Sequence, residues 1–345
     1  ETSMGTTGED RSLLLPGESK KIPFLGEFSL QCRLRYGQIP RLAVLPEWAE
    51  KTDKRDWHVD FVVKKGFDIA LAGKPSTSIV DAPVSETVAV CPLEFDGMKQ
   101  RLKVSEGDIV RKGSELMEDK VHPAFKLRAP AGGKVVEVVR GDRRFVEQIV
   151  IAVDPASEPE VFQAFPAESI ASLNRQVILD QLVATGALSL IRQRPFSGMA
   201  DVAVTPKSIF VNAMNTGPFQ ADAETVVHDD PVGFQAGLDL LIPLTEGAVH
   251  LCMGENAGET LKAAQRVTLH HFRGPHPAGN SSVHIARVDP MAPTDVVWTV
   301  KAVDVVVLGR LFLDGAFPES RIISLGGSNV KPGANQHYRV RMGGD

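Results

Sequence analysis

Hydrophobic positions in this chain follow two different patterns, and the change comes near residue 156. Between residues 58 and 155, short apolar stretches alternate with polar positions. Gly, Pro and Asp turns separate them roughly every eight to twelve residues, which predicts a small all-β barrel or sandwich. Between residues 156 and 325, strand-like and helix-like stretches alternate, which predicts a parallel α/β sheet.

The two ends of the chain show neither pattern. Residues 1–57 mix prolines, charges and short apolar groups without a sustained period, so we expect an extension that packs on the surface of another module. Residues 326–345 are rich in Gly and Arg and are expected to begin a truncated region without a closing element. The sequence therefore predicts an α+β multidomain protein divided into residues 1–57, 58–155, 156–325 and 326–345.

Individual elements of the α/β part follow from local spacing and turn residues. A helix at 231–244 is expected to begin at Pro231 with Asp229 or Asp230 as its N-cap. The other expected helices are 169–190, with a break at Gly186, then 259–266 and 296–312, although the valines of 296–312 also allow a strand. The expected strands are 209–215, 248–253, 267–272, 283–288 and 321–325.

Composition excludes several classes of partner and compartment. The net charge is −5, the pI is about 6.0 and aromatic residues make up 6%, so nucleic acid is not an expected partner. No apolar run reaches the ~18–20 residues that cross a bilayer, so membrane contact would be peripheral. The three cysteines are far apart, which argues against a disulfide scaffold or an all-cysteine metal site and favours a reducing compartment.

The most specific motif lies between residues 102 and 141. A Glu-Gly-Asp turn followed by Ala-Pro-Ala-Gly-Gly-Lys-Val is the layout of barrel-sandwich hybrid domains, the architecture of lipoyl and biotinyl carriers. Lys120 lies where such carriers place a modified lysine. However, it precedes Pro130 by ten residues and His122-Pro123 interrupts the hairpin, so a purely structural barrel is the favoured interpretation.

A second motif, His270–Gly279 with His284 shortly after it, allows two interpretations. Four histidines in fifteen residues could include metal ligands. The acidic partner nearest in sequence is Asp289, and prolines stiffen the loop, so we favour a rigid loop beside a crevice and predict no metal site.

The stretch from Arg192 to Phe219 contains the strongest candidate for a ligand crevice. Its strand-like part carries Asn212 and Asn215, and Asn-Thr-Gly-Pro places a turn at the carboxyl edge, where open α/β sheets bind ligands. Arg192 and Arg194 could contact an anion or pair with Asp201. The sequence contains no glycine cradle for a nucleotide and no nucleophile elbow, so it shows no catalytic centre of its own.

Five stretches together carry a family resemblance. They are residues 97–135, 194–222, 244–252, 270–285 and 306–315. In order and spacing, from Asp60 to Lys331, the chain resembles the A-subunit of the bacterial Na+-translocating NADH:quinone oxidoreductases. The resemblance implies a peripheral subunit on the cytoplasmic side of the bacterial inner membrane, docked on integral-membrane partners. NADH, flavins and iron–sulfur or iron centres would then belong to the partner subunits.

The resemblance also places the α/β part near a Rossmann-like domain found in the complex I flavoprotein and in the C-subunit of the Rnf complex. Those relatives hold flavin and nucleotide in a Gly-rich loop. The comparable residues here are 186–196, where Leu188, Leu190 and Ile191 stand in place of glycines. Because amides approach phosphates closely only where side chains are absent, we predict that this chain binds no flavin or cluster and is not catalytic alone.

Ubiquinone is the ligand that the resemblance suggests for this subunit. We predict that an aromatic wall with amide or imidazole donors would suit its ring and two carbonyls. The predicted site residues are Arg194, Phe196, Asn212, Asn215, His271, Gly274 and His276. Two alternatives remain: a stand-alone NADH- or flavin-dependent oxidoreductase, and a scaffold that only holds membrane partners together.

Overall fold

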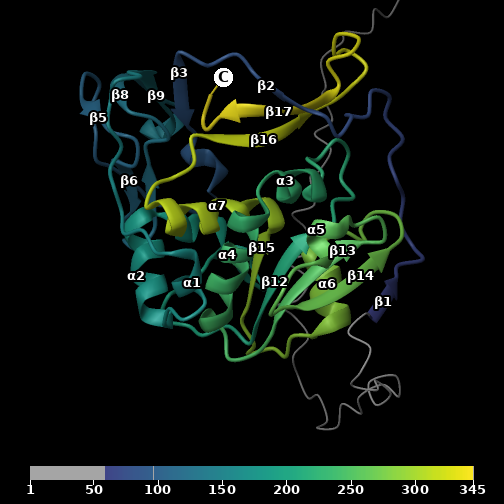
Figure 1. The fold of residues 1–345 in the computed structure, drawn as a ribbon. Helices are drawn as coiled ribbons and strands as arrows, with labels where there is room; N and C mark the ends of the chain where they lie inside the picture. Colours follow the sequence, from purple (N-terminus) through teal and green to yellow (C-terminus); the bar gives the residue numbers. More distant parts are fainter. Residues whose placement is uncertain (1–58, 96, 345) are drawn as a thin grey trace, which may run out of the picture. The chain divides into compact units, whose positions relative to one another are not determined.

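A seven-stranded sheet is the largest element of the computed structural model, which describes residues 59–95 and 97–344 (Figure 1). Its strands, in spatial order, are β1 (Val59–Val62), β14 (Thr268–Arg273), β13 (Val249–Gly254), β12 (Ser208–Ala213), β15 (Val297–Lys301), β10 (Arg192–Arg194) and β11 (Gly198–Met199). The strands from β1 to β15 run parallel, and β10 and β11 are antiparallel. The chain passes from β12 through β13 to β14 and then returns to the other side of β12, so strand order reverses between β12 and β15.

Helices cover both faces of this sheet because its strands are apolar on both sides. They are α1 (Ala167–Ile170), α2 (Arg175–Thr185), α3 (Ala223–Asp229), α4 (Pro231–Leu241), α5 (Glu259–Lys262), α6 (Ser281–Val288) and α7 (Ala302–Asp314), with short 3-10 turns η4 (Pro92–Glu94), η5 (Asp142–Arg144), η6 (Ala187–Leu190) and η7 (Ile242–Leu244). Successive side chains of β12 point to opposite faces. Ile209 and Val211 join the core beneath α1–α5 and α7, and Phe210 joins the core beneath α6.

Two helix ends agree with their sequence signals. Helix α4 begins at Pro231, and the Asp230 side chain accepts a hydrogen bond from the Gly233 amide. Helix α2 ends at Gly186, whose φ of 76° lies in the left-handed region that favours glycine. The predicted cap at Asp230 and the break at Gly186 are therefore both confirmed.

The front part of the chain folds into two small antiparallel sheets. One contains β3 (Thr87–Val90), β9 (Val146–Val153), β8 (Gly133–Arg140) and β5 (Ile109–Val110), and the other contains β4 (Gln100–Leu102), β6 (Glu115–Asp119) and β7 (Lys126–Arg128). A core that includes Leu116, Phe125 and Ile149, each at most 1% exposed, lies between them. Gly133 permits the chain to pass close to its neighbour, since a Cβ there would lie 1.9 Å from the Ala152 carbonyl oxygen.

A fourth sheet corrects the prediction for the end of the chain. It consists of β16 (Ser320–Leu325), β17 (Gln336–Arg341) and β2 (Ile79–Asp81). The predicted strand at 321–325 is present, but it lies outside the parallel sheet. The prediction that residues 326–345 lack a closing element is wrong, because β17 pairs with β16 over six residues and with β2 from the front of the chain.

Three further elements differ from the sequence prediction. Residues 283–288 belong to helix α6, because parallel strands β14 and β15 need a crossover between them. Residues 296–312 divide into β15 and α7 at Lys301. Strand β1, expected in the front module, pairs with β14 at the edge of the parallel sheet. The prediction for residues 1–57 lies outside the described residues.

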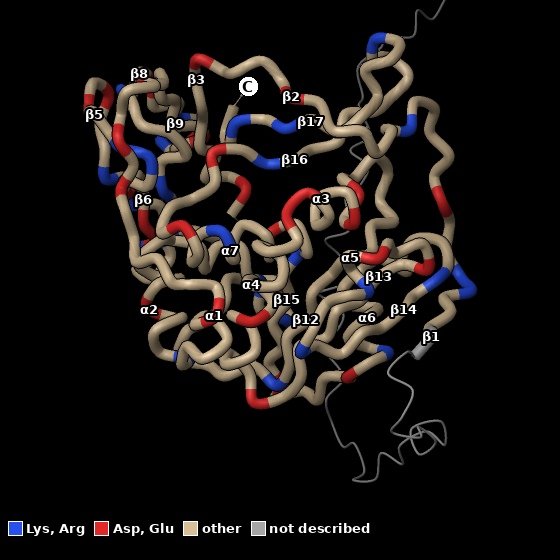
Figure 2. Tube along the Cα trace, in the orientation of Figure 1, with Lys and Arg blue, Asp and Glu red and all other residues tan. Residues whose placement is uncertain are grey.

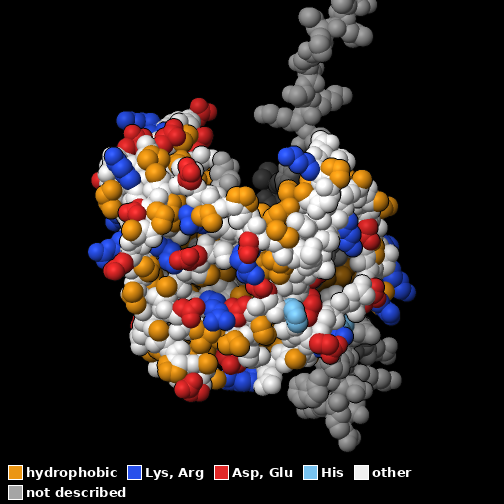
Figure 3. Space-filling model, turned by 45° about the horizontal axis from the view of Figure 1, so that its top comes forward, with side chains coloured by type: hydrophobic (Ala, Val, Ile, Leu, Met, Phe, Trp, Pro, Cys, Tyr) orange, Lys and Arg blue, Asp and Glu red, His pale blue; other side chains and the backbone are white. Residues whose placement is uncertain are grey.

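The surface carries charges of both signs. Lysine and arginine alternate with aspartate and glutamate along the trace in Figure 2 and over the face drawn in Figure 3, without a field of one sign. Within the described residues, no helix has the length and apolar character needed to cross a membrane.

Candidate functional site

Four of the predicted site residues meet at the carboxyl edge of the parallel sheet. The side chain of Asn212 reaches the loop after β14. There its Nδ2 donates to the Gly279 carbonyl at 2.8 Å and to Ser281 Oγ at 3.1 Å. Its Oδ1 accepts from the Met214 amide at 2.9 Å. The Asn215 side chain donates to the Ala221 carbonyl. Both amides therefore hold the loops of this edge together.

His276 and Gly274 belong to the same edge, and their contacts are also with the protein itself. His276 Nδ1 lies 3.0 Å from Thr216 Oγ1, and its backbone amide donates to Asp68 Oδ1 at 3.0 Å. Gly274 has φ of 130°, and a Cβ there would lie 2.1 Å from the Val63 carbonyl oxygen. Glycine is thus required for the close approach of residue 63.

The remaining predicted residues lie elsewhere. His271 lies inside β14, opposite Met253 and Asp60, and its side chain is half-buried. Arg194 pairs with Val297 at the start of β15, which also aligns with the start of β12. Arg194 and the neighbouring Phe196 therefore lie toward the amino edge of the parallel strands. The single crevice that the sequence predicted is divided between two edges of the sheet.

Arg194 and Phe196 also do not form the predicted combination of an aromatic wall and a polar donor. Phe196 is 92% exposed. The Arg194 Nε is buried and has no hydrogen-bond partner among the described residues, and burial lowers the pKa of its guanidinium.

A polar pocket of about 380 Å³ lies at the carboxyl ends of β12, β13 and β14. Of the predicted residues, Asn215 and Gly274 line it. The pocket is also lined by polar residues that were not predicted from the sequence, including Lys74, Asp222, Glu224, Glu255, Asn256 and Arg273. The Gly-Glu-Asn-Ala-Gly turn after β13 is the sequence signal for this pocket. Open α/β sheets bind ligands at the carboxyl ends of their strands, which is also why Asn215 was predicted.

Glu224 occupies the position in this pocket where an anionic ligand would meet backbone amides. Its two carboxylate oxygens each accept a hydrogen bond of 3.1 Å, one from the Thr260 amide and one from the Leu261 amide. These amides belong to the first turn of α5, and such groups bind phosphate in many nucleotide-binding proteins. In this chain an internal carboxylate satisfies them.

The segment compared with a flavin cradle is also filled from within. Leu188 and Ile191 are 2% and 0% exposed and belong to the main core of the α/β part, and Leu190 packs against that core. Gly186 faces the front barrel instead of a ligand, since a Cβ there would lie 2.5 Å from the Lys126 carbonyl oxygen. The branched side chains of this segment are therefore part of the core of the α/β part.

An apolar cavity lies beside this segment, between the front barrel and the α/β part. Its volume is about 340 Å³. Apolar groups that line it include Phe95, Leu127, Leu190, Val307 and Phe317, and polar ones include Lys126, Arg128, Ser189 and Arg321. The Arg192 guanidinium lies 5.6 Å from the centre of the Phe95 ring at the same junction.

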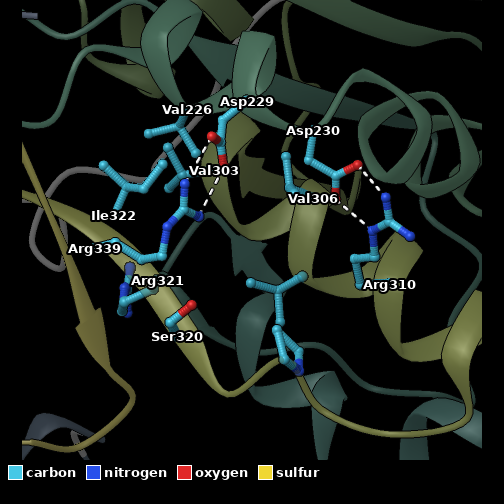
Figure 4. A pocket seen from close by; sticks show the side chains of 12 residues that line it. Val226, Asp229, Asp230, Val303, Val306, Arg310, Ser320, Arg321, Ile322 and Arg339 are labelled. Atoms are coloured by element: carbon cyan, nitrogen blue, oxygen red, sulfur yellow. Dashed lines mark hydrogen bonds and ion pairs between the residues drawn. The ribbon is translucent and has the colours of Figure 1, made fainter. Parts of the chain in front are cut away.

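A smaller pocket, of about 200 Å³, is closed by two ion pairs (Figure 4). Arg310 donates to both oxygens of Asp230 at 2.6 Å. Arg339 donates to both oxygens of Asp229 at 2.9 and 2.8 Å. Because two parallel hydrogen bonds fix the geometry of such a pair, β17 is held against the corner between α3 and α4.

Two histidines on neighbouring strands, His250 and His270, form a buried pair. His270 Nε2 lies 3.0 Å from Nδ1 of His250 on β13, and His284 Nε2 donates to the Ala278 carbonyl at 2.8 Å. Burial, followed by the neighbouring histidines, lowers the pKa of His270 to about 3. Burial lowers the pKa values of His250 and His284 to about 4. Residues 59–95 and 97–344 contain no group of three His, Cys, Asp or Glu placed to hold a metal ion.

Comparison with known proteins assigns the two modules to one family. Residues 61–154 match the family described as the NqrA N-terminal barrel-sandwich hybrid domain, and residues 173–317 match the NqrA second alpha/beta domain. The order of the matches is the order of the two modules in the fold. The chain belongs to the NqrA family.

Relatives of this NqrA-family chain agree with that assignment. The A-subunit of the Na(+)-translocating NADH-quinone reductase of Neisseria meningitidis serogroup B is 38% identical over 268 residues, and that of Pasteurella multocida is 38% identical over 269 residues. Each alignment covers 78% of this chain and 60% of the relative, so the chain spans about 60% of the length of these relatives. The predicted family and the barrel-sandwich and α/β modules are therefore confirmed.

Among solved structures, an NAD+-reducing [NiFe]-hydrogenase chain aligns with a TM-score of 0.34 and 16% identity, covering 51% of this chain and 39% of that one. A likeness this low carries no argument. The relation to the complex I flavoprotein and to the C-subunit of the Rnf complex stays a prediction.

Proposed function

We propose that this chain is a peripheral subunit of a sodium-translocating NADH-quinone reductase complex, on the cytoplasmic side of the membrane, and that it binds no flavin or iron centre itself. NADH, flavins and iron centres then belong to partner subunits. Family membership supports the assignment to such a complex. The observation that carries the cofactor-free role is the pair of 3.1 Å hydrogen bonds by which Glu224 occupies the α5 amides.

Co-purification from membranes tests this proposal. The tagged chain, produced in a bacterium whose own NqrA protein has been deleted, should purify with the integral-membrane subunits and be colourless when isolated. Flavin absorbance and NADH oxidation by the isolated chain would instead support a stand-alone oxidoreductase. Purification without any partner subunit would contradict membership in the complex. A pure scaffold predicts assembly without any quinone labelling of this chain.

We also propose that ubiquinone contacts the cavity between the barrel and the α/β part. The amides of Asn212 and Asn215 already bind loop carbonyls, and Arg194 lies toward the other edge of the sheet. The cavity offers what the predicted crevice does not: two phenylalanine rings beside hydroxyl and guanidinium donors, in a volume of about 340 Å³. An apolar cleft with a few convergent polar groups suits a quinone head group.

A photoreactive ubiquinone should therefore label residues 89–95 or 185–190 in the assembled complex. Leu190→Trp, which fills the cavity, is expected to weaken labelling about tenfold, a loss of ~1.4 kcal/mol in binding. Leu325→Trp is the matched control, because Leu325 is 43% exposed at the end of β16 and away from the cavity lining. Labelling confined to residues 212–215 or 271–276 would restore the original crevice.

A further inference from the structure

The connection from β1 to β2 presents a row of apolar side chains to solvent. Phe67, Ile69 and Leu71 are 87%, 67% and 51% exposed. They alternate along a stretch without regular structure, which runs up the right side of Figure 1. Single exposed apolar residues are common, but three of them close together on one segment indicate a contact surface.

This connection is fixed to the rest of the fold by its backbone. The Phe67 amide donates to the His276 carbonyl at 2.9 Å, and a Cβ on Gly66 would lie 1.9 Å from the same oxygen. At the other end, the Gly73 carbonyl accepts from the Gly327 amide at 2.9 Å. The backbone is therefore anchored at both ends while the apolar side chains between the anchors stay exposed.

Lysines flank the apolar row on both sides. Lys64 and Lys65 precede it, Lys74 follows it, and all three are exposed. None of these three lysines makes an ion pair with another described residue. Asp68 is the single acidic residue between them, and its Oδ1 accepts from the His276 amide. Figure 2 shows blue at both ends of this connection and one red position between them.

We propose that residues 64–74, here called the strip, contact the surface of an anionic lipid bilayer. Apolar side chains that project from a rigid support can enter the boundary between headgroups and acyl chains, and flanking lysines are attracted to anionic headgroups. The chain as a whole has a net charge of −5, so a local excess of lysine orients this face toward a negative surface and the remainder away from it.

The lysines that flank the strip favour a lipid surface over a protein as its binding partner. An apolar protein patch would not require lysines at both ends of the strip, whereas an anionic bilayer matches both the charges and the projecting apolar groups. The contact is a property of the chain itself and does not depend on assembly with other subunits, so its test is separate from the co-purification experiment.

Sedimentation of the full chain with vesicles tests the strip. Binding is expected to phosphatidylcholine vesicles that contain phosphatidylglycerol, and it should weaken with added salt because salt shortens the range of the attraction. Each lysine near an anionic surface contributes about fivefold to partitioning. Lys64→Gln, Lys65→Gln and Lys74→Gln combined should therefore weaken binding about 100-fold.

The apolar row is tested by Phe67→Ser, Ile69→Ser and Leu71→Ser in one variant, which should abolish vesicle binding without changing the melting temperature. Phe196→Ser is the matched aromatic control, since Phe196 is 92% exposed outside the strip. Lys134→Gln is the control for an exposed lysine. Both controls should bind vesicles like the unmodified chain.

Absence of binding to anionic vesicles, or equal binding by the serine variant, would overturn the proposal. A serine variant that keeps vesicle binding but no longer purifies with the membrane subunits would make the strip a protein interface, and would likewise overturn it.

Discussion

Replacing Gly309 with alanine is expected to lower the free energy of unfolding by ~3 kcal/mol, even though alanine is the better helix former by ~1 kcal/mol. Helices α4 and α7 pack side by side with their backbones in contact. A Cβ on Gly309 would lie 1.8 Å from the Gly233 carbonyl oxygen and 2.8 Å from the Gly237 nitrogen. Because backbone atoms of a packed helix cannot move aside cheaply, the two helices must separate.

Urea unfolding of the two alanine variants, Gly309→Ala and Gly198→Ala, measures this effect. A Cβ on Gly198 meets nothing within 4 Å, so this control should change stability by no more than ~0.5 kcal/mol. A Gly309→Ala protein as stable as the unmodified chain would show that α4 and α7 are farther apart than described. Gain of stability would mean that helix propensity alone decides at this position.

Lowering the pH from 7 to 5.5 is expected to reduce the free energy of unfolding by ~3 to 4 kcal/mol through three buried histidines. In the fold the pKa values of His250, His270 and His284 are lowered to about 4, 3 and 4, with burial as the largest cause for each. The unfolded value is about 6.5. Their neutral forms therefore stabilise the fold fully above pH 6.5, and this stability is lost as the pH falls toward 4.

Urea midpoints at several pH values measure this dependence, which should amount to ~1.4 kcal/mol per pH unit for each histidine below pH 6. His284→Asn should remove about one third of the slope. His228→Gln is the control for replacing an exposed histidine. A midpoint that does not vary between pH 7 and 5.5 would contradict the burial of these rings.

Elements with strong local signals could be predicted from the sequence. Strand β12 followed from the strand-like run predicted at 209–215, and helix α4 from the Asp230-Pro231 start. The barrel followed from its closely spaced turns, where Gly107, Gly113 and Gly133 have φ values of 97°, 96° and 151° that favour glycine. In each case the residues that define the element are adjacent in sequence.

Elements that depend on distant partners were placed wrongly or missed. The valines of residues 283–288 suit a strand, yet the crossover between two parallel strands makes them helix α6. Strand β17 is polar and arginine-rich, and it is ordered by pairing with β16 and β2 and by the contact of Arg339 with Asp229. The residues of the predicted crevice are divided for the same reason, because strand direction decides that Arg194 and Asn215 lie toward opposite edges.

The sequence by itself determined the family and the two kinds of module, because each depends on residues close together in the chain. Only the tertiary structure decided which groups meet. It brought Glu224 to the amides of α5, paired His250 with His270, and anchored the strip against His276. Each of these contacts joins segments whose spacing in sequence carries no information about their distance in the fold.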